Sequence, residues 1–135
     1  MTDDLADWLA ALGQLELGEP VRVVWRSDEG PPMGAVSWVG GDGWRVELAQ
    51  GQSDDELLIT MFHELGHVVL GHVTRGAGES GRVRLWDGLA RVDPAYVRQL
   101  AAEREAAAEA WARQRVACLG PMTLAVTRAL ASEVA

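Results

Sequence analysis

The sequence predicts an α+β fold in which a small antiparallel β-sheet is covered by two helices. Three observations lead to this prediction. Short segments rich in β-branched and aromatic residues alternate with period two between residues 21 and 48. Apolar residues then recur at helical spacing from residue 53 to residue 72, and again from residue 94 to residue 119. A chain of 135 residues with a hydrophobic share of 48% is expected to form one domain, residues 1–135.

The first part of the chain contains a short helix followed by the strands. An amphipathic helix is predicted over residues 3–12, with Thr2 as its N-cap and Gly13 as its end. Val21–Trp25 has the alternation of a strand with one apolar face. A hairpin follows, with strands Ala35–Val39 and Trp44–Leu48 joined by Gly40–Gly43.

The next helix begins and ends with clear signals. Ser53 with Glu56 three residues later is a capping-box start, and Gly71 is the predicted stop. The Gly-rich segment 74–93 that follows is long for a connection in a compact domain. It is either a mobile lid or a flexible insertion, and the sequence leaves both interpretations open.

The last third of the chain is predicted to be helical. Asp93-Pro94 is typical of a helix start, with a cap followed by a first-turn proline, and this helix should run to about Leu119. Gly120-Pro121 stops it. A final helix is expected from a Thr123 cap to Ser132, with three apolar residues facing inward: Leu124, Leu130 and Val134.

The first long helix carries the pattern H-E-x-x-H as His63, Glu64 and His67. Two histidines at this spacing project from one helix face and can bind one metal ion together. Glu64 lies about 100° around the helix from His63, beside the metal. A carboxylate there can take a proton from a water that the metal activates and return it to a leaving group. The alternative is that both histidines are buried and satisfied by hydrogen bonds.

Composition narrows the functional classes. A net charge of −8 argues against direct binding of nucleic acid, which requires a basic surface. No apolar run approaches the length of a membrane span, and the acidic start Met-Thr-Asp-Asp does not resemble a signal peptide. A single cysteine, Cys118, allows no internal disulfide. These features predict a cytoplasmic protein.

A catalytic zinc site typically has three protein ligands, so a third ligand is required. His72, just past Gly71, reaches the metal if the chain bends back. The other candidates are Glu103, Glu105 and Glu109 on the 94–119 helix. Glu103 borders the apolar face of that helix, so face geometry favours it over the other two. Plotted at about 100° per residue, that face consists of Tyr96, Val97, Leu100, Ala107, Trp111 and Cys118.

The run from His63 to His72, followed by Glu-Arg-Glu-Ala at residues 103–106, resembles the ImmA/IrrE zinc metallopeptidases. It is also similar to the zincin-like domain of ArdC-type antirestriction proteins. The resemblance is specific over Ser53–His72 and extends to Glu103–Gly120. It implies a gluzincin-like fold with Zn²⁺ on the two histidines of the motif, the intervening glutamate as general acid and base, and a downstream glutamate ligand. Family members commonly cut a helix-turn-helix repressor within the cell.

The chain departs from the family pattern at the third ligand. The pattern places the glutamate four residues before an aromatic residue, and Trp111 would put Ala107 at that position. Taking Glu-Arg-Glu-Ala as the anchor selects Glu105 instead, with Glu109 where the aromatic residue belongs. We rank Glu103 first, Glu105 second and Glu109 third, and an absent ligand would leave a weak or inactive site.

These observations predict a zinc-dependent metallopeptidase that hydrolyses a peptide bond in an intracellular protein, with a transcriptional repressor as the candidate substrate. An edge strand of the sheet could align the substrate by adding it as an extra strand. The rival hypothesis is a catalytically weak or inactive zincin-fold module that sequesters a partner protein in antirestriction or repressor control. Neither hypothesis requires contact with nucleic acid or a membrane.

Overall fold

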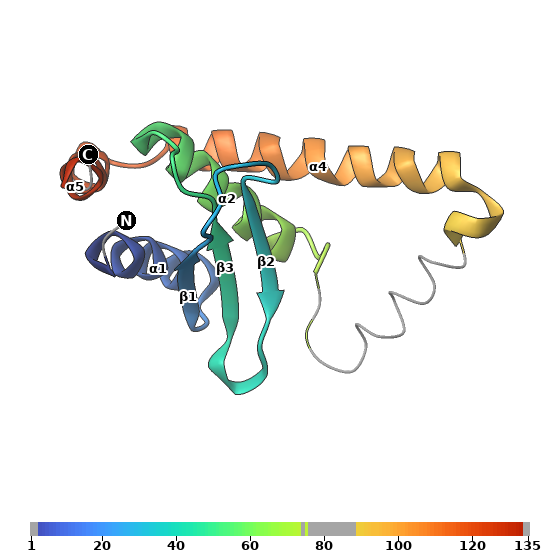
Figure 1. Cartoon of the computed structure of the whole chain (residues 1–135), viewed down its shortest axis with the longest axis horizontal. Helices are drawn as coiled ribbons and strands as arrows, with labels where there is room; N and C mark the ends of the chain where they lie inside the picture. The colour runs from blue at the N-terminus through green and yellow to red at the C-terminus, as the bar shows by residue number, and fades with distance from the viewer. Residues whose placement is uncertain (1–2, 74, 76–88, 134–135) are drawn as a thin grey trace.

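The computed structural model describes residues 3–73, 75 and 89–133. Among the sequence-based expectations, the Thr2 cap, most of the Gly-rich 74–93 segment and Val134 lie outside the described residues. Residues 89–92 are helical. The other elements, labelled as in Figure 1, are α1 (Asp3–Leu17), β1 (Val21–Trp25), β2 (Gly34–Trp38), the short 3-10 helix η1 (Gly40–Asp42), β3 (Trp44–Leu48), α2 (Asp54–Val69), α4 (Pro94–Ala117) and α5 (Pro121–Ser132).

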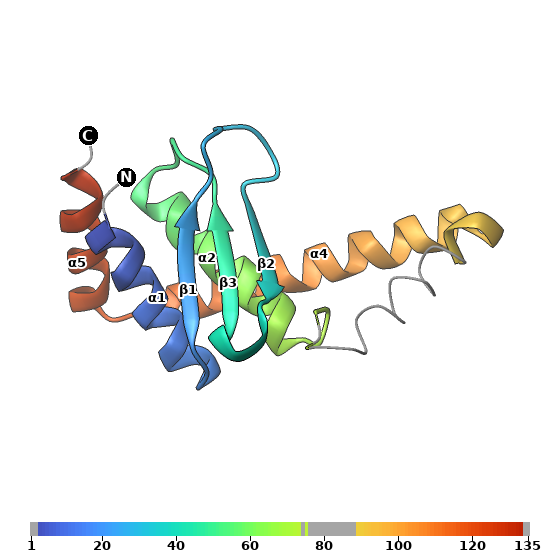
Figure 2. The same ribbon diagram turned by 60° about the horizontal axis from the view of Figure 1, so that its bottom comes forward.

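β3 is the central strand of a three-stranded sheet with the order β1-β3-β2 (Figure 2). β2 pairs with β3 antiparallel, with Trp38 opposite Trp44, so the predicted hairpin is confirmed. β1 pairs with β3 in parallel, with Val21 opposite the same Trp44. The fold is therefore α+β as predicted, but the sheet is mixed, and the prediction of an antiparallel sheet is wrong.

The connection between β1 and β2 accounts for the parallel pair. This segment crosses the end of β3, where Arg26 N–H donates to Leu48 O and Ala49 N–H donates to Met33 O, both at 2.8 Å. β2 is thereby placed on the far side of β3, and β1 and β2 do not pair with each other. The alternation of apolar residues identifies which face of a strand is buried, but it carries no information on which strands are neighbours.

α2 lies between the sheet and α4, because it contacts β2 and β3 as well as α4 (Figures 1 and 2). One face of the central strand is fully covered, and the exposed fraction of its side chains Trp44, Val46 and Leu48 does not exceed 1%. α1 packs on β1 and α2, and α5 packs on α1. Trp8 Nε1–H donates to Thr127 Oγ1 at 2.9 Å, which joins α1 to α5. The remaining fully buried large side chains of this core include Leu5, Leu9, Leu57, Leu58, Met61 and Leu65.

The predicted helix starts are confirmed for α2 and α4. Ser53 Oγ accepts from Glu56 N–H at 3.2 Å, and the Glu56 carboxylate accepts from Ser53 N–H at 3.4 Å, which completes the capping box. Gly71 follows the end of α2 with a φ of +76°, the conformation expected of a terminating glycine. The Asp93 carboxylate accepts from Tyr96 N–H at 3.1 Å at the start of α4.

α1 is longer than predicted. It passes through Gly13 and continues to Leu17, and the chain turns at Gly18, where φ is +68°. A Cβ atom at Gly13 would lie 3.0 Å from Met61 Cε and 3.0 Å from Val21 Cγ1. Glycine at this position therefore allows α1 to approach β1 and α2 closely and does not end the helix.

The ends of the last two helices also differ slightly from the predictions. α4 ends at Ala117 rather than Leu119. α5 begins at Pro121 with Gly120 as its N-cap, so Thr123 is not the cap, because proline is well suited to the first turn of a helix. Leu124 and Leu130 pack against the core as predicted.

α4 projects beyond the rest of the molecule at its N-terminal end (Figure 1). Its only buried residues, Ala108 and Ala112, lie in its second half, where it crosses α2. Although α4 has 24 residues, neither it nor any other described helix combines the length and apolar character needed to cross a membrane.

Candidate metal centre

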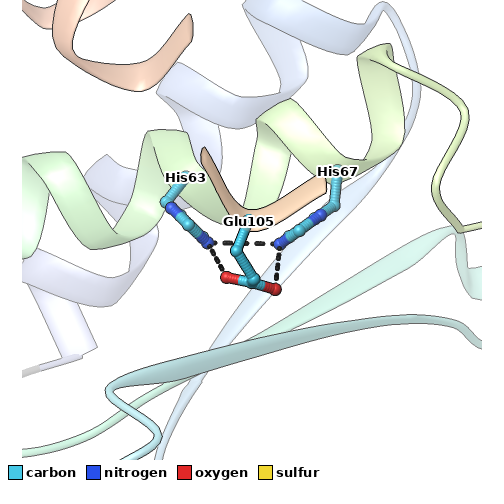
Figure 3. A group of neighbouring side chains, drawn as sticks. All are labelled: His63, His67 and Glu105. Carbon is cyan, nitrogen blue, oxygen red and sulfur yellow. Dashed lines mark hydrogen bonds and ion pairs between the residues drawn. The ribbon is translucent and has the colours of Figure 1, made fainter. Parts of the chain in front are cut away.

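α2 and α4 bring His63, His67 and Glu105 together (Figure 3). His63 Nε2 lies 2.8 Å from Glu105 Oε2, and His67 Nε2 lies 3.1 Å from Glu105 Oε1. The two Nε2 atoms are 3.2 Å apart. The imidazoles are mostly covered, with exposed fractions of 15% and 12%, whereas the carboxylate of Glu105 is open to solvent. We call these three residues the candidate metal-binding trio, or the trio for short.

The geometry and chemistry of the trio suit a zinc ion. Two imidazole nitrogens and one carboxylate are a ligand set found in catalytic zinc sites. Ligand atoms 2.0–2.1 Å from a tetrahedral zinc ion lie roughly 3.3 Å from one another. The two imidazole nitrogens, 3.2 Å apart, are close to this value, and each of them lies next to a different oxygen of the Glu105 carboxylate. With one ligand atom from each residue, all within 4.8 Å of one another, the trio could hold a metal ion.

The other nitrogen of each imidazole also has a partner. His63 Nδ1 lies 2.9 Å from Glu109 Oε2, and His67 Nδ1 lies 2.9 Å from His72 Nδ1. Arg113 Nη2 contacts Glu109 Oε1 at 3.0 Å and so holds that carboxylate in place. Such contacts at Nδ1 orient an imidazole and present its Nε2 lone pair to a metal. Glu109 and His72, both considered from the sequence as direct ligands, occupy this supporting position in the structure.

The surroundings of His67 and His72 favour the neutral form of both imidazoles. Burial lowers the pKa of His67. Burial also lowers the pKa of His72, and the nearby positive charge of Arg104 adds to this effect. A neutral imidazole has the free lone pair that a metal requires, so the lowered pKa of His67 favours metal binding.

Glu64 lies beside the trio and is almost fully buried, with an exposed fraction of 7%. Burial raises the pKa of its carboxyl group to about 7, opposed by the charge of His63 and reinforced by that of Glu105. Helical spacing predicted that Glu64 would lie beside a metal bound by the two histidines. In the structure Glu64 lines the same cleft as the trio.

The structure selects Glu105 rather than Glu103 as the third member. Glu103 is exposed, and its Oε1 accepts from the side-chain N–H of Gln99 at 3.3 Å. The ranking from the sequence is thus corrected, because the face of α4 that meets α2 is centred on Ala108 and Ala112. Glu105 lies about one turn before Ala108 on this face.

The predicted apolar face of α4 was out of phase with the real contact face. Tyr96, Ala107 and Cys118, which belonged to the predicted face, are all exposed. Trp111 is partly buried and packs against the core, with its ring 6.2 Å from that of Phe62. The packing of Trp111 therefore confirms its place on the predicted face, whereas the exposure of the other three residues does not fit that face.

No family model, curated protein or solved structure matches this chain. The function therefore has to be inferred from the residues of the site.

A cleft of about 1030 Å³ contains the trio and Glu64. β2, which is an edge strand of the described sheet, lines one side, and α4 lines the other. Arg104 of α4 is also part of the lining. The apolar members of the lining include Met33, Val36, Ile59, Val73, Val97 and Ala101. A cleft of this size and mixed character can hold several residues of an extended peptide.

The sequence analysis missed three residues close to Glu64, namely Gly34, Gln52 and Thr60. All three line the cleft. A glycine at the start of a strand is a known sign of close backbone approach, and this sign was available for Gly34. Gln52 and Thr60 carry no comparable signal, because their roles depend on contacts between segments distant in sequence.

Proposed function

We propose that this chain is a zinc-dependent metallopeptidase. The observation that carries the proposal is the candidate metal-binding trio placed in a large cleft beside the buried carboxylate of Glu64. A zinc ion held by the trio would polarise the scissile carbonyl and make a water molecule more acidic. The resemblance of residues 53–72 to the ImmA/IrrE peptidases supports the same conclusion.

In this mechanism the residues of the chain have distinct roles. His63, His67 and Glu105 hold the metal, and Glu109 and His72 orient the two imidazoles through their Nδ1 atoms. Glu64 takes a proton from the attacking water and delivers it to the nitrogen of the leaving group. The new C–O bond forms first, and the peptide C–N bond breaks once its nitrogen has received the proton, which leaves a new carboxyl group and a new amino group.

The substrate in this proposal is a protein or an extended peptide. β2 lines the cleft as an edge strand, and a peptide segment can pair with such a strand through its main chain. The family resemblance makes a helix-turn-helix repressor the first protein to test. The acidic net charge of −8 disfavours nucleic acid as a substrate.

The proposal is tested by incubating the zinc-loaded protein with denatured casein and with candidate repressors. We expect fragments in the presence of zinc, none with a chelator and none with Glu64→Gln, although Glu64→Gln still binds zinc because Glu64 is not a ligand. Cleavage by Glu64→Gln would refute the assigned mechanism. A zinc-loaded protein that forms a stable complex with a partner but never cuts it would favour the rival binding module.

A further inference from the structure

Gly34 is the point of closest approach between the edge strand β2 and α2. A Cβ atom at Gly34 would lie 2.8 Å from Thr60 Cγ2, 3.2 Å from Glu64 Cγ and 3.2 Å from the carbonyl oxygen of Glu47. Gly34 does not have a positive φ, so backbone conformation does not require glycine there. The requirement is one of space, and part of that space belongs to the side chain of Glu64.

A buried glutamine fixes the distance between the two elements. The Gln52 side chain donates to Met33 O at 3.3 Å and to Ala49 O at 2.9 Å. Its Oε1 accepts from Thr60 Oγ1 at 2.6 Å. Gln52 therefore ties the residue before Gly34 to α2, one turn before Glu64. β2 cannot retreat from Glu64 without breaking these hydrogen bonds.

Within the part of the chain that the structure describes, no hydrogen bond between described residues holds the Glu64 carboxylate. Its direction is therefore determined by what packs against its aliphatic stem. A Cβ atom at Gly34 would lie 3.2 Å from Cγ of that stem, so the backbone of β2 passes close to the stem at this glycine.

We propose that Gly34 is a positioning residue for Glu64. The missing side chain lets β2 lie against the stem of Glu64, and this contact directs the carboxylate along the cleft beside the trio. The catalytic role of Gly34 rests on the function proposed above. The contact between Gly34 and Glu64 can be tested without measuring enzymatic activity.

The contact is tested by a double-mutant cycle on stability in the presence of a chelator. Gly34→Ala should lower the midpoint of thermal unfolding. This decrease should be smaller when Glu64 is also changed to alanine, because the Cγ atom of Glu64 that the new Cβ would clash with is then absent. Gly41→Ala is the matched control, since a Cβ there meets nothing within 4 Å. The change in the unfolding midpoint caused by Gly41→Ala should be the same whether residue 64 is glutamate or alanine. An equal loss for Gly34→Ala in both backgrounds would overturn the proposal.

The catalytic consequence is tested with an internally quenched peptide that the native protein cleaves, chosen from a randomised mixture. Gly34→Ala should lower kcat roughly tenfold with little change in KM, because a small misplacement of a catalytic group is costly. Zinc stoichiometry should not change, since Gly34 is in contact with Glu64 rather than with the trio. A Gly34→Ala protein with native kcat would overturn the inference while leaving the proposed function intact.

A second variant separates folding from positioning. Thr60→Ser removes the methyl group nearest to the new Cβ atom and keeps the hydroxyl that donates to Gln52. Added to Gly34→Ala, it should restore part of the unfolding midpoint but not kcat, because the contact with Glu64 remains. Recovery of both would show that Gly34 has only a structural role. A zinc-loaded native protein that cleaves no peptide would refute the proposed function, and the stability cycle would still decide whether Gly34 acts on Glu64.

Discussion

At the scale of single residues, the site depends on the distinction between two glutamates only two residues apart on α4. Glu105 contacts both imidazoles of the trio, whereas Glu103 contacts only Gln99 on its own helix. Both carboxylates are exposed, so exposure does not distinguish them. Their different positions around the helix axis do.

If the trio binds zinc as proposed, removing Glu105 should abolish zinc binding. We expect about one zinc ion per chain in the native protein and in Glu103→Ala, and a loss of zinc after dialysis in Glu105→Ala, because two histidines seldom hold zinc alone. Elemental analysis of the three proteins measures this directly. Zinc retained by Glu105→Ala and lost by Glu103→Ala would mean that the assignment of the third ligand is wrong.

The buried carboxyl group of Glu64 should give the metal-free protein a distinctive pH dependence. Its pKa is raised from 4.5 to about 7, so the folded protein holds this proton more tightly than the unfolded chain. The resulting stability is fully present below a pH of about 4.5 and is lost as the pH rises through about 7. Across this range the native protein should lose up to roughly 3 kcal/mol relative to Glu64→Gln.

Urea unfolding of the two proteins at several pH values, with a chelator present, measures this difference. Burial lowers the pKa of His67 and His72, so they contribute the opposite slope below a pH of about 6.5. Both proteins contain these histidines, and their contribution largely cancels in the comparison. A difference in unfolding free energy that does not vary with pH would contradict the burial of an ionisable group at Glu64.

At the scale of helices and strands, the trio exists because α2 and α4 pack closely. A Cβ atom at Gly66 would lie 3.1 Å from Trp111 Cε3 and 3.3 Å from Ala108 O. Ala108 and Ala112 are the fully buried residues of α4. Small residues on both helices therefore let the backbones approach, and this approach carries Glu105 to the histidines.

Enlarging the contact should weaken metal binding from a distance. Ala108→Leu should force α4 away from Gly66, destabilise the fold by about 1–3 kcal/mol and weaken zinc binding roughly tenfold. Ala107→Leu is the matched control, because Ala107 is exposed and substitutions at such positions usually have small effects. Zinc titration and urea unfolding compare the two variants. Equal zinc affinities would show that the helix spacing does not control the site.

The same elements show how far the sequence could lead. The caps at Ser53 and Asp93 were predicted because hydrogen bonds between near neighbours specify them. The contact face of α4 was not, because alanine occurs on several sides of this helix and gives no clear apolar periodicity. The parallel pairing of β1 was also missed, since strand order depends on the path of the connection across β3.

At the scale of the whole molecule, a metal ion in the trio would join two helices that are far apart in the chain. His63 and Glu105 are separated by 42 residues. Ligands that bind only the folded state stabilise it by mass action, by about 4 kcal/mol at a thousandfold excess over Kd. Zinc should therefore raise the thermal unfolding midpoint of the native protein and leave that of Glu105→Ala nearly unchanged. Calorimetry with and without zinc tests this, and equal shifts in both proteins would place the metal elsewhere.

The central position of β3 also has a consequence for the order in which the chain folds. Trp38 and Trp44 close a short loop, whereas Val21 pairs with the same Trp44 from a distant part of the chain, a difference of roughly 1 kcal/mol in loop-closure entropy. The hairpin should therefore form early, β1 should join later, and the trio, with its still longer separation, should assemble last. Zinc would then slow unfolding and leave the rate of refolding unchanged, which stopped-flow measurements in both directions would reveal.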